Sequence, residues 1–205
     1  MVREEENGYS PQIDYDFTLF SDTDYYLFAE GSHFQLYERL GAHIAEVEGR
    51  RGVFFAVWAP NAWAVSVIGD FNGWMPGIHR LGRRHMDSGI WEGFIPGLDK
   101  GCLYKYHIES RQNLYRVDKA DPYGFFHETS PRTGSVVWDL DYEWNDNEWM
   151  TGRRQHNTLN GPMSIYEVHL GSWQRVPEEG NRHLTYRELA PRLANYVKET
   201  GFTHV

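Results

Sequence analysis

Cysteine is almost absent from this sequence, and the motifs that commonly mark metal or redox sites are missing too. Cys102 is the single cysteine among 205 residues, so no intrachain disulfide can form. No CxxC or HExxH motif occurs, which leaves no sequence signal for a zinc site. We therefore expect neither a metal ion nor another cofactor, and we interpret Cys102 as a small core residue on a strand.

Long hydrophobic runs are also lacking. No apolar stretch approaches the ~20 residues that a membrane-spanning helix needs. The first residues show no basic patch followed by an apolar segment, which is the mark of a secretory signal. We expect a cytoplasmic protein with no membrane partner.

Positive charge is scarce. Lys and Arg number 20 against 29 Asp and Glu, which gives a formal net charge of −9. An acidic chain repels phosphate backbones, so we expect no nucleic-acid partner. The one basic cluster, Arg80, Arg83 and Arg84, is better interpreted as a solvated hairpin face.

Aromatic residues, in contrast, are abundant at 16% of the chain. They recur in short alternating segments that are separated by Gly, Pro, Asn and Asp, and the Asn72-Gly73 pair marks a tight turn. Such spacing is typical of an antiparallel β-sandwich. The fold class is therefore mostly β, with an immunoglobulin-like sandwich expected over residues 46–141 and strands near 52–60, 64–69, 90–97, 102–110, 113–117 and 135–140.

Two segments flank the predicted sandwich. Residues 1–45 become aromatic after an acidic start, so we expect an N-terminal extension that packs on the sandwich, with a short helix between residues 32 and 42. Residues 142–160 are polar and rich in Asn, Asp and Arg, which favours a linker to the next domain.

The pattern changes again over residues 161–205. A nearly continuous apolar run at 164–170 predicts a buried strand. Thr185 and Glu188 form a capping box that begins a helix, and Gly201 is placed to end it. A second strand follows from Phe202. Strand, helix and strand make one βαβ unit, and hence the start of a parallel sheet.

Four segments resemble one family of enzymes. WAPNAWAVSVIGDFNGW (58–74) and DPYGFF (121–126) resemble the carbohydrate-binding module 48 that precedes the barrel in glucan branching and debranching enzymes. SIYEVHLGSWQR (164–175) and LTYRELAPRLANYVKETGFTHV (184–205) resemble the first strand, first helix and second strand of the α-amylase-type barrel of glycoside hydrolase family 13. The sequences of these segments are most similar to those of the bacterial glycogen branching enzymes.

The resemblance implies a retaining transglycosylase that forms α-1,6 branches in glycogen, with α-1,4-glucan as its substrate. It also implies that residues 161–205 are the first piece of a truncated (β/α)8 barrel, whose remainder is their partner. Retaining chemistry needs two carboxyl groups ~5 Å apart, and in this family they lie on later barrel strands. None of those motifs occurs in residues 1–205, so we assign no catalytic residue. Glu92 and Glu167 are candidates by type only, and an ion-pair role is the better interpretation of Glu167.

The resemblance also suggests three substrate-binding residues on the sandwich. Trp74 matches the family's sugar-stacking tryptophan, and Lys105 matches its hydroxyl-binding lysine. The second tryptophan of the glycogen-sensing members is absent, and Tyr115 is the candidate substitute. For Trp74, a ligand platform and interface packing remain open alternatives, because exposed aromatic residues serve both uses.

Two other functions remain open at this point. The chain could be a non-catalytic glucan-binding or interaction module. It could also be a fragment of a debranching or trehalose-releasing relative with the same architecture.

Overall fold

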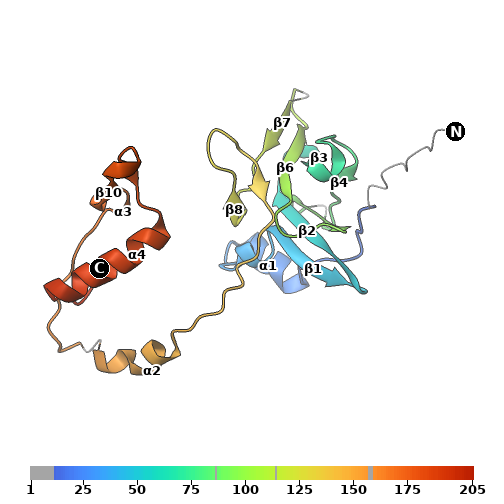
Figure 1. Cartoon of the computed structure of the whole chain (residues 1–205). Helices are drawn as coiled ribbons and strands as arrows, with labels where there is room; N and C mark the ends of the chain where they lie inside the picture. The colour runs from blue at the N-terminus through green and yellow to red at the C-terminus, as the bar shows by residue number, and fades with distance from the viewer. Residues whose placement is uncertain (1–11, 86, 114, 157–158) are drawn as a thin grey trace. The chain divides into compact units, whose positions relative to one another are not determined.

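The computed structural model describes residues 12–85, 87–113, 115–156 and 159–205. The first part of the expected N-terminal extension, residues 1–11, therefore lies outside the described residues. The chain divides into two compact units, Met1–Tyr142 and Glu143–Val205. Each unit is described by itself (Figure 1).

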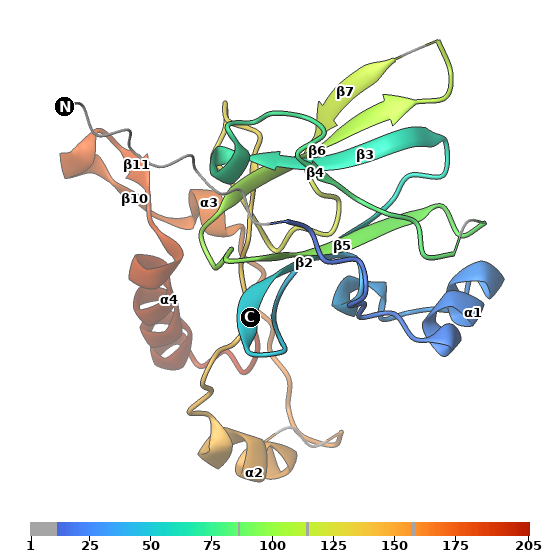
Figure 2. The same cartoon turned by 90° about the vertical axis from the view of Figure 1, so that its right-hand side faces the viewer.

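The first unit is built from two antiparallel sheets. One sheet has the order β1-β2-β5, with bounds Gly41–Val47, Arg50–Trp58 and Ile90–Pro96. The other has the order β4-β3-β6-β9-β8, with β7 paired to β6. The strands of this second sheet are β3 (Ala62–Gly69), β4 (His79–Arg80), β6 (Leu103–Ser110), β7 (Arg116–Lys119), β8 (Phe126–His127) and β9 (Ser135–Val136). Figure 2 shows the two sheets as stacked layers, so the predicted sandwich architecture is confirmed.

The main core lies between the two sheets and follows the alternation of the sequence. Val53, Phe55 and Val57 of β2 point inward and are buried. They meet Val65 and Val67 of β3 and two tyrosines of β6. Burying one such side chain stabilises the fold by about 1.5–3 kcal/mol, so the period-two pattern fixes which face of each strand turns inward.

The opposite face of β2 is buried as well. Phe54 and Ala56 pack beneath residues that precede the sandwich, including Phe17 and Phe20. These residues flank helix α1 (Asp22–Glu30), which begins at a capping box between Ser21 and Asp24. A 3-10 turn, η1 (Leu36–Glu38), lies where a short helix was expected. The N-terminal segment thus covers one sheet.

Several elements differ from the sequence-based expectation. The strands expected at 113–117 and 135–140 form only at Arg116–Lys119 and Ser135–Val136. In the first case Asn113 adopts a left-handed conformation, φ 55°, and turns the chain before the strand can begin. Strand β1 straddles the boundary expected at residue 45. Helix α2 (Asn147–His156) forms inside the expected linker.

The second unit is organised around helix α4 (Tyr186–Thr200). Thr185 and Glu188 form the predicted capping box, and Gly201 ends the helix with φ 78°, so both expectations are confirmed. Leu189 and Leu193 bury their side chains against Leu184. The remaining elements of this unit are α3 (Leu170–Trp173), β10 (Arg175–Val176), η3 (Pro177–Glu179) and β11 (Arg182–His183).

The strand expected at 164–170 is not formed. Only a single parallel bridge joins Ile165 to His204, and α3 begins at Leu170. A buried parallel strand needs hydrogen-bonding neighbours on both sides, and this segment has one, so the extended run stops after one bridge. None of the described helices is long and apolar enough to cross a membrane.

Candidate functional site

Trp74 is held by a tight turn at the end of β3. The turn begins with the 3-10 segment η2 (Asp70–Asn72). The Asn72 side chain is buried and makes three polar contacts. Its Oδ1 accepts a hydrogen bond from the Gly69 amide at 2.9 Å. Its Nδ2 donates to the Val67 carbonyl at 2.9 Å and lies 2.9 Å from His79 Nδ1. One amide side chain therefore fixes the loop that carries Trp74.

The backbone of Trp74 is strained. Its φ is 60°, and Gly73 before it has φ 61°. A bulky residue in the left-handed region costs of order 1–2 kcal/mol, and such strain clusters at functional sites. Two bonds hold the conformation: the Trp74 amide donates to the Gly69 carbonyl at 2.9 Å, and its indole Nε1 donates to Asp70 Oδ1 at 2.7 Å. The indole remains 36% exposed.

Lys105 lies at the same end of the sheet. It stands on β6 opposite Ile68, next to the Gly69–Tyr104 pair where the Trp74 turn begins. Tyr104 and Tyr106 point into the core, so Lys105 points to the outer face. Its Nζ donates to Thr133 Oγ1 at 2.7 Å. Thr133 belongs to the connection between β8 and β9, which no sequence pattern linked to Lys105.

Tyr115 is not brought to this end. Its carbonyl accepts from the Ser110 amide at 2.8 Å, which places it beside the last residue of β6. Lys105 and Ser110 are five residues apart on one strand, or about 17 Å. The β7 residue paired next to Lys105 is Lys119, opposite Tyr106. The structure thus groups Trp74 with Lys105 and separates both from Tyr115.

A rigid buried network supports β6 from below. The Asp121 carboxylate is buried and accepts hydrogen bonds from the Tyr104 hydroxyl at 2.7 Å and the Tyr106 hydroxyl at 3.1 Å. Burial raises the pKa of Asp121 although both bonds oppose the rise. The Asp121 amide donates to Ser135 Oγ at 2.8 Å, which ties β9 to the same point. Lys105, between the two tyrosines, therefore sits on fixed backbone.

Neither of the two carboxylates considered by type is arranged as a catalytic pair. Glu92 is buried on β5 and pairs with Arg84 at 2.9 Å. It also accepts from Thr18 and Tyr25, each at 3.1 Å, so it fastens the N-terminal segment to the sheet. Glu167 lies in the other unit and is exposed.

The outer face at Trp74 and Lys105 can hold a polar ligand with flat apolar surfaces. An indole one-third exposed covers a C–H face by dispersion. The ammonium of Lys105 and the hydroxyl of Thr133 offer a donor and a donor-acceptor to hydroxyl groups. These are the complements of a sugar ring.

Comparison with known proteins places this surface in a defined class of domain. Residues 39–124 match the family model "Carbohydrate-binding module 48 (Isoamylase N-terminal domain)". The sandwich is therefore similar to domains of carbohydrate-binding module 48 over these residues.

The whole chain is similar to the 1,4-alpha-glucan branching enzyme GlgB. It is 56% identical to that of Aquifex aeolicus over 92% of this chain and 30% of the relative, and 55% identical to that of Gloeobacter violaceus over 92% and 26%. A crystal structure of apo pullulanase from Klebsiella pneumoniae is 25% identical, with a TM-score of 0.47 over 68% of this chain and 16% of that one. Over this shared region the chain is similar to the N-terminal portion of the glucan branching enzymes, and it spans under a third of the length of these two curated relatives.

Proposed function

We propose that this chain is the N-terminal part of a retaining α-1,4-glucan branching enzyme of the α-amylase superfamily, acting in glycogen synthesis in the cytoplasm. The glucan-binding module extends from strand β1, at residue 41 rather than the expected 46, to residue 141, residues 12–40 are its packed extension, and residues 142–160, which contain α2, are the linker. Residues 161–205 begin the barrel, for which the parallel bridge between Ile165 and His204 is the support.

Within that assignment, the module binds α-glucan through Trp74, with Lys105 beside it. The observation that carries this proposal is the strained, hydrogen-bonded conformation of Trp74, which keeps a large ring partly exposed at the end of β3. Tyr115 is the weaker candidate, because it lies at the other end of β6.

The test is a titration of the 205-residue chain with maltoheptaose, followed by the indole signals in proton–nitrogen NMR spectra. A single ring platform buries little area, so we expect dissociation constants near the millimolar range. The Trp74→Ala variant should bind about two- to twelvefold more weakly, since the aromatic contact is worth ~0.5–1.5 kcal/mol.

Trp138→Ala is the matched control. Trp138 is 37% exposed, against 36% for Trp74, and it packs on Lys100 and Phe126 instead. Trp74→Gly adds a second control, because glycine keeps the left-handed turn without a Cβ. If Trp74→Ala and Trp74→Gly titrate like the native chain, Trp74 is not the platform.

A further inference from the structure

Trp63 is an exposed aromatic ring at the opposite end of β3. Strand β3 pairs Ala62 with Ser110 but Ala64 with Glu109, so Trp63 is the extra residue of a β-bulge. A bulge re-aims the side chain of the inserted residue. The indole is 67% exposed, which means that the core does not use it.

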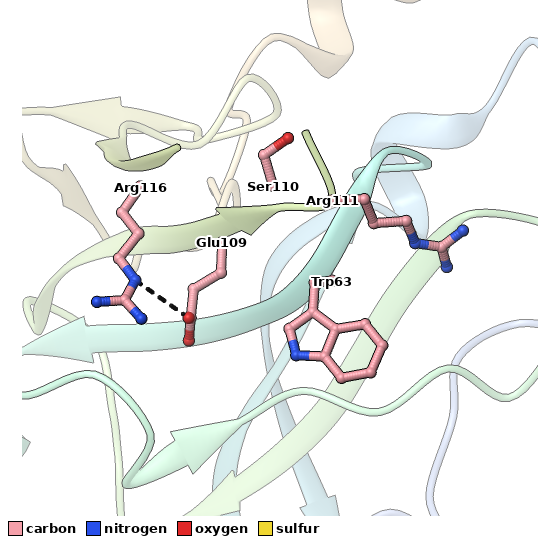
Figure 3. A pocket seen from close by; sticks show the side chains of 5 residues that line it. All are labelled: Trp63, Glu109, Ser110, Arg111 and Arg116. Atoms are coloured by element: carbon pink, nitrogen blue, oxygen red, sulfur yellow. Dashed lines mark hydrogen bonds and ion pairs between the residues drawn. The ribbon is translucent and has the colours of Figure 1, made fainter. Parts of the chain in front are cut away.

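The ring lines a small pocket with charged neighbours. The pocket has a volume of about 270 Å³ and is lined by Trp63, Glu109, Ser110, Arg111 and Arg116. Figure 3 shows the indole with the Glu109–Arg116 pair on one side and Arg111 on the other. Arg116 Nε donates to Glu109 Oε2 at 3.2 Å; among residues 12–85, 87–113 and 115–156 no other partner occupies the second carboxylate oxygen or the other guanidinium N–H groups.

Arg111 is positioned but not neutralised. Its backbone amide donates to the Asn61 carbonyl at 3.0 Å, which fixes its place beside the bulge. Within the described part of the chain, its guanidinium has no hydrogen-bond or ion-pair partner. Arg111 thus contributes a cation with five donors to the lining of the Trp63 pocket.

These groups select a neutral polyhydroxylated ring. Sugar hydroxyls both donate and accept, and the pocket offers carboxylate acceptors and guanidinium donors around one aromatic face. A purely apolar ligand would leave the charges unpaired at a cost. The pocket has two arginines and one glutamate, so it could also attract an anion, but only a polyhydroxylated ring would use the exposed indole face together with both donors and acceptors. The volume lies just below the roughly 300–1,000 Å³ of drug-sized sites, which suits one ring.

We propose that the pocket of Trp63, Glu109, Arg111 and Arg116 is a second saccharide subsite, which takes one glucose ring of an α-glucan. The choice of glucose rests on the proposed function, whereas the recognition of a sugar ring rests on the pocket alone. Glu109 and Lys105 share the outer face of β6 four residues apart, or about 13 Å. One glucan chain can therefore lie along β6 and contact Trp74 at one end and Trp63 at the other.

The experiment uses the same maltoheptaose titration of the 205-residue chain, with the Trp63 and Trp74 indole signals followed separately. The Trp63 signal should shift in the native chain and still shift in Trp74→Ala. Trp63→Ala and Arg111→Ala should each weaken binding about three- to tenfold. Trp58→Ala is the matched control, because Trp58 is 55% exposed on the other sheet and should leave the affinity unchanged.

The outcomes separate this inference from the proposed function. If Trp63 does not shift and Trp63→Ala binds like the native chain while Trp74→Ala is weakened, the subsite does not exist and the Trp74 platform stands. If the Trp63 signal shifts and Trp74 is silent, the subsite stands and the Trp74 platform fails. An Arg111→Ala variant that binds normally would overturn the role given to the guanidinium.

Discussion

At the scale of single residues, Asp121 shows how a buried carboxyl group supports strand β6. Removing its carboxylate takes the 2.7 Å acceptor from the buried Tyr104 hydroxyl and leaves the buried Tyr106 hydroxyl with only the longer contacts to the Gly41 and Ala56 carbonyls, at 3.5 and 3.4 Å. Each unsatisfied buried group costs ~1–3 kcal/mol. We expect Asp121→Ala to lower the free energy of unfolding by about 2–5 kcal/mol, measured by urea denaturation. A change below about 0.5 kcal/mol would contradict the network.

The same residue gives a pH signature. Burial raises the pKa of the Asp121 carboxyl, so the folded state binds the proton more tightly than the unfolded state. The charged form therefore opposes folding, and its cost disappears as pH falls through the raised pKa. As pH falls through the raised pKa of Asp121, the free energy of unfolding of the native chain should increase relative to that of the Asp121→Asn variant. This comparison isolates Asp121 from the other carboxylates.

Residue-scale prediction from the sequence had a clear limit. The motif around Asn72-Gly73 correctly marked a turn, and the sequence placed Lys105 on a strand that the structure contains. The sequence did not single out Thr133, and it suggested core or interface packing for Trp63, which is 67% exposed. Their positions depend on a contact 28 residues away and on a strand register with a bulge, and neither leaves a local pattern.

At the scale of elements, alternation identified the long strands well, because each buries one face in a core that both sheets share. Alternation did not predict the structure where the formation of a strand depends on a hydrogen-bonding neighbour. The segment 164–170 has the apolar composition of a buried strand, but it pairs with a neighbouring segment only at one bridge, between Ile165 and His204. Helix α1 was missed because its capping box precedes a segment with little one-sided apolar patterning.

Helix α4 carries a prediction that is local to its first turn. The Arg182 guanidinium beside Glu188, with hydrogen bonds from Thr185, lowers the pKa of Glu188 to about 2. The stabilising effect is present above the ordinary value near 4.5 and is lost as pH falls through about 2. The carboxyl pKa, followed by carbon-13 NMR, should rise toward its ordinary value in Arg182→Ala.

Arg187→Ala is the control for that measurement, since Arg187 lies in the same helix but makes none of the recorded bonds to Glu188. It should leave the Glu188 pKa low. A Glu188 pKa near 4.5 in the native chain would show that the capping box and the ion pair between Arg182 and Glu188 are not formed in solution.

At the scale of the whole molecule, the two units differ in how much apolar surface they can bury. The sandwich encloses a core between two sheets and a second cluster beneath the N-terminal segment. The second unit buries three leucines. It leaves several apolar side chains exposed, namely Met163, Ile165, Leu170, Tyr196 and Val205.

We therefore expect the second unit to be far less protected than the sandwich. Ordering a residue costs ~1–2 kcal/mol, and a core of three buried leucines with one parallel bridge to the 164–170 segment offsets little of that cost. Amide hydrogen exchange of the 205-residue chain should show fast exchange at residues 164–170 and slow exchange in β2 and β3. The backbone groups of Ile165 and its neighbours lack a second strand, which leaves them open to water or to another edge. Protection at 164–170 equal to that of β2, in a protein shown to be monomeric, would mean that residues 143–205 fold as an independent unit.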